Sequence, residues 1–489
     1  MIYAALFLAL FVPSVSSGGE VPISDDSMSC LECHRHMNPG IVEGWKKSRM
    51  SRITPSAAME APEISRRVSF DSLSEELENV VVGCAECHGL NAAGRPDAFE
   101  HNGFEIVTVV SPRDCAACHP VEAGQYRENK MSHAYGNLEK NELYRDLTRS
   151  ITGIRRFENM TVSLEDPDRM SLDDSCRQCH GTFVKVEGAV TRDTDYGEME
   201  FPFLSGWPNQ GVGRINPDNS RGACSACHTR HQFSIEMARK PDTCSQCHKG
   251  PDVPAYKVYQ VSKHGNIYSS LGGGWDFEAV PWTVGKDMTA PTCAACHVSL
   301  LVNREGEILT ERTHRMNDRL AWRIFGLIYA HPQPVSPDTT TIRNAAGLPL
   351  PTELSGEPVV EYLIDSGEQE TRRNRMEAAC LSCHSRSWVE GHFARYENTI
   401  AKTNEMTVTA TQIMLEAWRR GAAKGLPEND SIFNEALEKK WVEQWLFYAN
   451  STRYSSAMGG ADYGVFAGGR WQMSKNIQEM SDLLRLKEK

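Results

Sequence analysis

Residues 224–248 read CSACHTRHQFSIEMARKPDTCSQCH and contain the pattern C-x-x-C-H twice. The pattern occurs eight times in the 489 residues and takes up all sixteen cysteines. The first cysteines are Cys30, Cys84, Cys115, Cys176, Cys224, Cys244, Cys293 and Cys380, and the second are Cys33, Cys87, Cys118, Cys179, Cys227, Cys247, Cys296 and Cys383. The histidines that close the motifs are His34, His88, His119, His180, His228, His248, His297 and His384.

This spacing has a chemical reason. Two thiols three residues apart can each add to a vinyl group of the same haem, and the following histidine can then bind the iron. Zinc sites, redox dithiols and disulfides also use paired cysteines, but none of them requires a histidine after every pair. The sequence therefore predicts eight covalently bound haem c groups per chain.

The motifs also predict the fold. Close intervals, such as that from Cys224 to Cys244, bring neighbouring haems together and favour a connected path for electron transfer. At this density the haems supply much of the apolar core. We therefore expect a mainly α, multihaem cytochrome c body over residues 18–400, made of helix and loop with little sheet.

Eight histidines remain outside the motifs. Haems that only transfer electrons are commonly closed by a second axial side chain, whereas a catalytic haem keeps one face open. Seven closed haems would use seven of these histidines and leave one for acid–base chemistry, but eight closed haems would use them all. The spare histidines are His36, His101, His133, His231, His264, His314, His331 and His392.

The N-terminus and the charge indicate where the protein works. Residues 1–17 are typical of an export signal, because an apolar run from Ile2 to Val12 is followed by a signal-peptidase-like site. No later stretch is long and apolar enough to span a bilayer, so we expect an exported, periplasmic protein without a transmembrane anchor. The net charge of -12, without a basic stripe, argues against nucleic acid as a partner and fits a positively charged electron carrier.

From about residue 401 the composition changes, and residues 401–489 are predicted to form a C-terminal module of long helices that serves packing or oligomerisation. Helices are expected over about 407–421 and 471–486. Between them, Asp430 and Ser431 are expected to cap a third helix, and Gly459-Gly460 to break the run. The apolar stripe of that third helix is predicted to be core, and it consists of Phe433, Leu437, Trp441, Trp445 and Tyr448.

Together these features resemble the hydroxylamine oxidoreductase family of octahaem cytochromes c. The likeness is most specific from Cys224 to His297, through CSACHTRHQFS, PDTCSQCHKGPD, the SKHG around His264, and APTCAACH. It implies a homotrimer and an active fourth haem, which here is the haem of Cys176, Cys179 and His180. It also implies that several spare histidines are second axial ligands, namely His101, His133, His231, His264 and His314.

The resemblance also suggests pocket residues. Where the family carries an Asp-His pair after the sixth motif, this sequence has Asp252-Val253. The family's pocket tyrosine falls near Tyr329 or His331, and a histidine there could restore the base that Val253 lacks. Family members that oxidise hydroxylamine cross-link the active haem to a tyrosine of the adjacent subunit. Tyr463 occupies that place here, either cross-linked or as a plain loop tyrosine.

One further departure concerns the first haem. The family's W-x-x-S-x-H segment ends here in Met50 instead of histidine. The second ligand of that haem is therefore Met50, His36 or His392. Met50 would raise the reduction potential of the haem.

These features lead to a functional hypothesis. We expect a periplasmic enzyme that oxidises hydroxylamine to NO or nitrite at the open fourth haem, with Asp252 and His331 moving protons. The other haems would pass electrons to a small cytochrome c or a quinone-linked cytochrome. One rival keeps the site but reduces nitrite or hydroxylamine, and a second rival is an electron-transfer protein with every haem closed. Tyr463 favours oxidation and Val253 favours reduction, and the balance leans slightly to oxidation.

Overall fold

The computed structural model describes residues 21–487, and the expected export signal at 1–17 lies outside the described residues. Helices account for 46% of the structure and strands for 12%, in small sheets only. The expectation of a mainly α protein with little sheet is therefore confirmed. No helix within residues 21–487 is long and apolar enough to cross a membrane.

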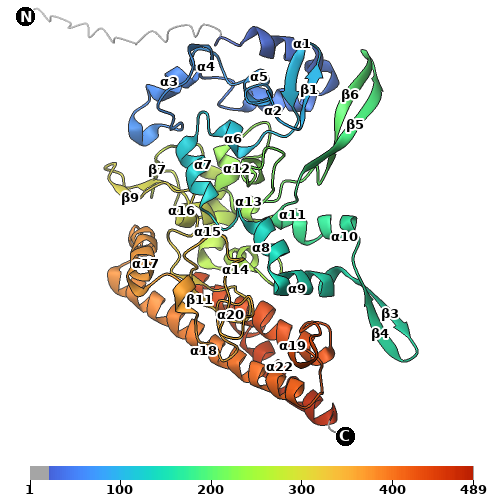
Figure 1. Cartoon of the computed structure of the whole chain (residues 1–489). Coiled ribbons are helices and arrows are strands. Elements are labelled where there is room, and N and C mark those ends of the chain that lie inside the picture. The colour runs from blue at the N-terminus through green and yellow to red at the C-terminus, as the bar shows by residue number, and fades with distance from the viewer. Residues whose placement is uncertain (1–20, 488–489) are drawn as a thin grey trace, which may run out of the picture.

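The N-terminal part, blue in Figure 1, consists of short helices, loops and one hairpin. Local signals fix these helices; for example, the Ser24 hydroxyl accepts a 3.2 Å hydrogen bond from the Ser27 amide at the start of the first helix. The elements are α1 (Asp25–Met37), α2 (Pro39–Lys47), α3 (Pro55–Met59), α4 (Glu75–Glu78), α5 (Ala85–His88), β1 (Ala98–His101) and β2 (Phe104–Val107).

The middle part carries most of the motifs on short helices. Two antiparallel hairpins, β3–β4 and β5–β6, project from its side (Figure 1). The elements up to the longer hairpin are α6 (Pro112–Cys115), α7 (Pro120–Arg127), α8 (Ala134–Lys140), α9 (Glu142–Thr152), β3 (Ile154–Glu158), β4 (Thr161–Glu165), α10 (Arg169–Asp173), α11 (Cys176–His180), β5 (Lys185–Thr194) and β6 (Gly197–Ser205). They are followed by α12 (Ile235–Arg239), α13 (Pro241–Ser245), α14 (Ala255–Val261), α15 (Lys263–Leu271), β7 (Trp282–Thr283), α16 (Cys293–His297), β8 (Leu301–Val302), β9 (Ile308–Thr310), β10 (Trp322–Arg323) and β11 (His331–Pro332).

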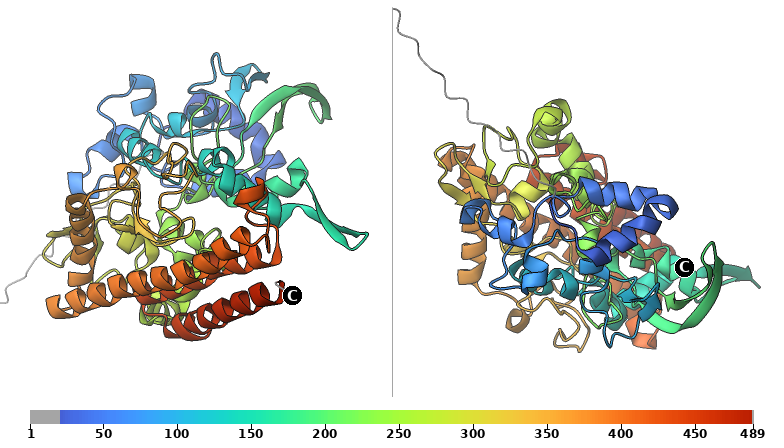
Figure 2. Two further views of the ribbon diagram at one scale, coloured as in Figure 1. Left: turned by 60° about the horizontal axis from the view of Figure 1, so that its bottom comes forward. Right: turned by 90° about the horizontal axis from the view of Figure 1, so that it is seen from above.

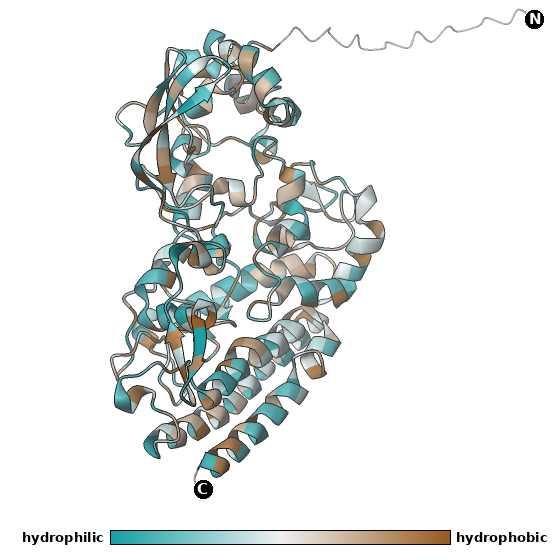
Figure 3. Ribbon diagram, turned by 90° about the vertical axis from the view of Figure 1, so that its right-hand side faces the viewer, coloured by the Kyte–Doolittle hydropathy of each residue, from teal (hydrophilic) through white to brown (hydrophobic). Residues whose placement is uncertain are grey.

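The C-terminal part is a layer of longer helices, and Figure 2 shows the longest, α18, with the C-terminal helices packed along it. Hydrophobic and hydrophilic residues are interspersed along these helices (Figure 3), as expected for helices with one buried side. The elements are α17 (Ser366–Leu381), α18 (Arg386–Arg419), α19 (Ala436–Val442), α20 (Ala449–Met458), α21 (Ala461–Val465) and α22 (Arg470–Lys487).

Most of the expected C-terminal helices are found, with two differences. The helix expected from residue 407 begins at Arg386, so the proposed boundary at 400/401 lies inside α18. The helix expected to be capped by Asp430 and Ser431 begins instead at Ala436, where Glu435 and Glu438 form the capping box. The Ser431 hydroxyl donates a 2.7 Å hydrogen bond to Asp146.

The stripe predicted to be core is buried at four of its five residues, and the fifth, Tyr448, is half-buried. Phe433, Leu437, Trp441 and Trp445 are each at most 1% exposed and pack together in the largest hydrophobic cluster. Helix α20 ends directly before Gly459, whose φ of +75° stops the helix where the glycine pair predicted a break. The same cluster includes Leu143, Leu147 and Leu350, so the C-terminal layer shares its apolar core with the middle part.

Candidate haem sites and candidate active site

Each motif forms about one turn of helix. The amide of the motif histidine donates to the carbonyl of the first cysteine, at 2.9 Å for His88 to Cys84 and 3.0 Å for His228 to Cys224. Because residues i, i+3 and i+4 of a helix share one face, both thiols and the imidazole point the same way. The spacing therefore presents the three groups that covalent haem attachment requires.

The motifs open into one continuous cavity of about 4140 Å³. All eight motif histidines and every motif cysteine except Cys33 line it. A pocket for a single small ligand measures roughly 300–1,000 Å³, so this space fits a connected set of large groups.

Four motif histidines face a second histidine across a gap. A metal–imidazole bond of about 2 Å on each side places the two ring centres roughly 6 Å apart, and the four observed pairs match this spacing. The ring centres are 6.1 Å apart for His34–His101, 6.5 Å for His88–His231, 6.5 Å for His228–His314 and 6.1 Å for His384–His264. The side chains present therefore fit an iron held between two imidazoles at four of the motifs.

Hydrogen bonds orient several motif histidines. The Nδ1 atom of His88 lies 2.7 Å from the carbonyl oxygen of Val107, and that of His180 lies 3.3 Å from the carbonyl oxygen of Ala134. Burial lowers the pKa of both rings, which keeps them neutral. A neutral imidazole that donates through Nδ1 presents Nε2 as a metal ligand.

Contacts between cysteines of different motifs show how the sites are connected. Thiols lie within hydrogen-bonding reach in the pairs Cys30–Cys84, Cys115–Cys224, Cys179–Cys247 and Cys244–Cys293. The cysteines of three more pairs lie near enough for their charges to interact, namely Cys87–Cys118, Cys227–Cys244 and Cys296–Cys380. The first, second, third, fifth, sixth, seventh and eighth motifs thus form one line, and the fourth joins it as a branch at the sixth.

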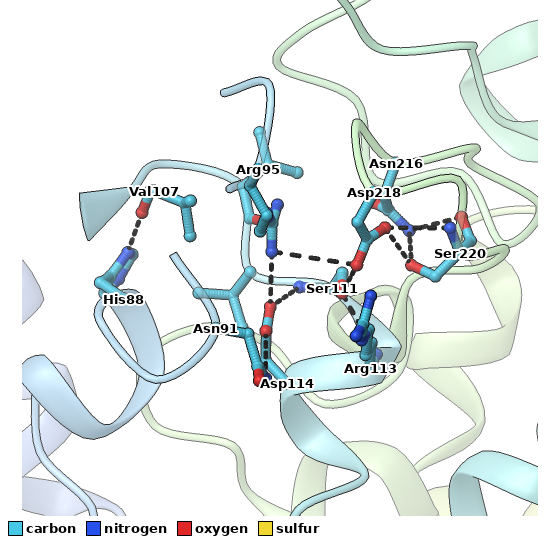
Figure 4. A network of polar contacts seen from close by, with 12 residues as sticks. His88, Asn91, Arg95, Val107, Ser111, Arg113, Asp114, Asn216, Asp218 and Ser220 are labelled. Carbon is cyan, nitrogen blue, oxygen red and sulfur yellow. Dashed lines mark hydrogen bonds and ion pairs between the residues drawn. The ribbon is translucent and has the colours of Figure 1, made fainter. Parts of the chain in front are cut away.

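A buried ionic cluster holds the second, third and fifth motifs together (Figure 4). The Arg95 guanidinium contacts Asp97 at 2.9 Å and Asp114 at 3.0 Å, and lies 3.9 Å from Asp218. Asp114 directly precedes Cys115, and the Ser111 hydroxyl donates a 2.6 Å bond to Asp218 in the loop before Cys224. The cluster therefore fixes the relative positions of three motifs.

The remaining spare histidines lie elsewhere. His133 accepts a 3.1 Å hydrogen bond from Arg221, and its Nε2 lies 3.1 Å from the carbonyl oxygen of Arg127. His36 is exposed on α1, whereas His392 lines the cavity. Since His101 faces His34, the histidine opposite the first motif is none of the three candidates considered for that haem.

The fourth motif is one of four whose histidine belongs to no histidine ring pair among the described residues, the others being those of His119, His248 and His297. At His180 the surroundings are charged. The charges that act on it are Asp252 and Arg323, which line the cavity, and Glu139. Tyr454 also lines the cavity, and the charges of Asp252 and Arg323 act on its phenol. These residues form the candidate active site.

A buried lysine lies beside Arg323. Lys130 lines the cavity, and its ammonium donates to the side-chain oxygen of Gln333. Burial, with the nearby charges of Arg323 and Arg372, holds the pKa of Lys130 well below its ordinary value. Within residues 21–487, no carboxylate forms an ion pair with Lys130 or Arg323. An anion bound here would offset their repulsion, so anion binding and protonation of Lys130 would favour each other.

The other expected site residues lie outside this cavity lining. The Tyr329 hydroxyl donates 2.8 Å and 3.0 Å hydrogen bonds to Leu354 and Thr411 within the main hydrophobic cluster. His331 is 2% exposed, and burial with the charge of Arg323 lowers its pKa to about 3. Tyr463 packs with Val253 and Tyr454 in a second hydrophobic cluster of its own chain.

Sequence reasoning identified Asp252 but missed Arg323, Tyr454 and Lys130. Arg323 and Tyr454 lie in segments without haem motifs, 143 and 274 residues after His180 in the sequence. No local pattern distinguishes them from ordinary surface or core residues. Only the fold places them beside the fourth motif.

Three family models match parts of the chain. They are "Seven times multi-haem cytochrome CxxCH" over residues 213–323, "Cytochrome c7 and related cytochrome c" over 163–249, and "Cytochrome c554 and c-prime" over 114–200. A solved structure described as a hypothetical multiheme protein is 40% identical, with a TM-score of 0.90, and the alignment covers 95% of this chain and 96% of that chain. The chain belongs to the multihaem cytochromes c. This cytochrome therefore binds haem c covalently, as its motifs predicted, and is a redox protein.

Two more distant likenesses come from Kuenenia stuttgartiensis. A probable nitrite reductase-hydroxylamine oxidoreductase fusion protein is 26% identical over 412 residues, which are 80% of this cytochrome. The match covers only 36% of that relative's length. A solved structure of a reducing HAO-like protein complex shares the fold, with a TM-score of 0.61 at 18% identity over 95% of this chain and 85% of that chain.

Proposed function

We propose that this cytochrome reduces nitrite, or the hydroxylamine derived from it, at the haem attached through Cys176, Cys179 and His180. The observation that carries the proposal is Arg323 on the cavity wall, with Lys130 beside it and no carboxylate in an ion pair with either of them within residues 21–487. Nitrite is an anion, whereas hydroxylamine is neutral near pH 7. A cationic pocket therefore favours nitrite as the substrate that enters.

Three side chains, and where the structure places them, argue against oxidation of hydroxylamine as the main activity. A base with a pKa of about 3, as in His331, accepts protons poorly near pH 7. Val253 supplies no base, and Tyr463 packs within its own chain. Taken together, they reverse the slight preference for oxidation that the sequence suggested. The name of the distant fusion relative contains both a nitrite reductase and a hydroxylamine oxidoreductase, so it is consistent with either direction.

The chain's own groups suit the reductive reaction. Reducing nitrite to ammonium consumes six electrons and eight protons and releases two waters. The haem supplies electron transfer to the bound nitrogen compound. Arg323 and Lys130 would hold the anion and orient it, and Asp252 with the Tyr454 phenol would relay protons from solvent. The line of motifs that joins the fourth at the sixth would deliver the electrons one after another.

We extend the proposal to the remaining features of the protein. All eight motifs carry haem, the chain is exported to the periplasm, and it assembles as a homotrimer. A small cytochrome c or a quinone-linked cytochrome supplies the electrons. The complete use of sixteen cysteines in eight motifs supports the haem count.

Nitrite binding to the ferric protein tests the proposal. Arg323→Met removes a charged donor worth about 1.5–3 kcal/mol, so nitrite binding followed by electron paramagnetic resonance should weaken roughly 10- to 100-fold. Arg323→Lys should retain most of the affinity. The control is Arg304→Met, because Arg304 is exposed and lies outside the cavity lining. Equal losses of nitrite and hydroxylamine affinity in Arg323→Met, or no loss, would contradict the assignment.

A further inference from the structure

An aromatic stack connects the eighth motif to the surface. The ring of Trp388 lies parallel to that of His384, with centres 3.9 Å apart and planes at 14°, and on its other side lies His392, at 5.2 Å and 3°. Trp388 and His392 are four residues apart in α18 and so share one side of that helix, and His384 lies just before the helix begins. Helix α18 holds the tryptophan in place, because the Ser385 hydroxyl caps it by accepting a hydrogen bond from the Trp388 amide.

This stack lies at one end of the electron-transfer line. Among the described motif contacts, the eighth motif joins only the seventh, through Cys296 and Cys380. Cys383 is the one exposed cysteine of the sixteen. Trp388 borders the haem cavity and is 42% exposed.

The surface around Trp388 has an excess of positive charge. Arg386 and Arg395 are exposed, Arg395 where it also borders the cavity, and neither forms an ion pair within residues 21–487. Arg395 folds back over Gly391, and its charge acts on His392. Two acidic residues lie in the same part of α18. Glu397 is paired with Arg373 at 2.8 Å, so Glu390 is left to offset the positive charge of the patch. On a protein of net charge -12, this patch has the opposite sign.

We propose that Trp388, with Arg386 and Arg395, forms the docking surface for an acidic redox protein. Electrons would pass singly between that partner and the haem of Cys380, Cys383 and His384, with one partner oxidised as the other is reduced. An exposed tryptophan is a typical anchor of a protein interface, and the basic rim supplies charge complementarity to a partner rich in carboxylates. This differs from the positively charged carrier that the net charge alone suggested, because the charge beside the eighth motif decides where a carrier docks.

The surface serves electron entry as well as exit, so the inference does not depend on the direction of the reaction at the fourth motif. Small oxidants of opposite charge test it on the haem-loaded protein without enzymatic turnover. Protein reduced with dithionite, with the excess removed, is mixed in a stopped-flow instrument with hexacyanoferrate(III) or hexaammineruthenium(III). Each oxidant takes one electron, and the loss of the reduced haem absorbance gives the rate.

Charge reversal by Arg386→Glu with Arg395→Glu should slow oxidation by hexacyanoferrate(III) about tenfold at low ionic strength and accelerate oxidation by hexaammineruthenium(III). Both effects should fade at high salt. Lys424→Glu is the control, because this exposed lysine lies beyond the far end of the 34-residue α18. Equal effects on the two oxidants, or effects no larger than those of the control, would overturn the assignment of the patch.

The role of the tryptophan is tested separately. Trp388→Ala should slow both oxidants, and Trp388→Phe, which keeps an aromatic ring in the stack, should restore most of the rate. The haem content and reduction potentials of each variant are measured alongside, so that a lost or shifted haem is recognised. If Trp388→Ala retains all its haems and its potentials but oxidises at the wild-type rate, electrons leave elsewhere and the proposal fails.

Discussion

Arg95→Met tests the buried cluster that holds three motifs together. The side chain of Arg95 is 6% exposed, and those of Asp97, Asp114 and Asp218 are at most 2% exposed. Removing one partner of a buried ion pair leaves an uncompensated charge and costs roughly 3–5 kcal/mol. Methionine fills similar space, so most of this loss would be electrostatic. We expect the free energy of unfolding to fall by about that amount at pH 7.

The loss in the free energy of unfolding of Arg95→Met should also depend on pH. Hydrogen bonds from Ser111 and Ser220, with the charge of Arg95, outweigh burial and hold the pKa of Asp218 below its ordinary value. A depressed carboxylate pKa contributes stability above the ordinary pKa of about 3.9, and this stability is lost as the pH falls through the folded value. Without Arg95 the buried carboxylates should have raised pKa values. The difference between variant and wild type should therefore be largest near pH 7 and should shrink toward pH 4.

Urea unfolding followed by circular dichroism measures both the loss in the free energy of unfolding and its dependence on pH. The matched control is Arg156→Met, which breaks an ion pair with Glu165 whose side chains are 57% and 55% exposed, and which should cost at most about 1 kcal/mol. If Arg95→Met is no less stable than this control, or if its deficit does not depend on pH, the cluster does not hold the motifs as described.

Three further predictions concern the haems. The intact mass of the exported protein should exceed that of the mature polypeptide by eight haems, and seven or fewer in a fully matured sample would show that a motif stays empty. His101→Ala should convert one low-spin haem to high-spin in the electron paramagnetic resonance spectrum, because His101 faces His34 with ring centres 6.1 Å apart; an unchanged low-spin signal would remove it as a ligand. Because Tyr463 packs within its own chain, the dithionite-reduced protein should lack an absorbance band well to the red of ordinary haem c. Tyr463→Phe should leave that spectrum unchanged, and a red-shifted band that disappears in the variant would establish the cross-link.

Much of the haem-binding architecture could be predicted from the sequence, because its chemistry is local. The C-x-x-C-H spacing requires only one helical turn, and the aromatic stripe from Phe433 to Trp445 follows helical periodicity. The start of α18 could not be placed, because this helix follows directly on the last haem motif. The cap at Glu435 was missed because Asp430 and Ser431 have equally good capping chemistry.

The active site was harder to predict for a physical reason. The pairing of His34 with His101 and the placement of Arg323 beside His180 depend on how distant segments pack. His331 has the right chemistry for a proton carrier, but burial beside Arg323 lowers its pKa too far. Such effects are set by neighbours that are remote in sequence, and no local pattern reports them.

The direction of the reaction is the central claim, and one preparation of the haem-loaded protein can test it. Nitrite consumption with a reduced viologen as electron donor is measured beside hydroxylamine-dependent reduction of an oxidised dye, at pH 7 and low ionic strength. The cationic pocket predicts that nitrite consumption is the faster activity and that Arg323→Met lowers it. Rapid dye reduction by hydroxylamine, with no consumption of nitrite, would contradict the account.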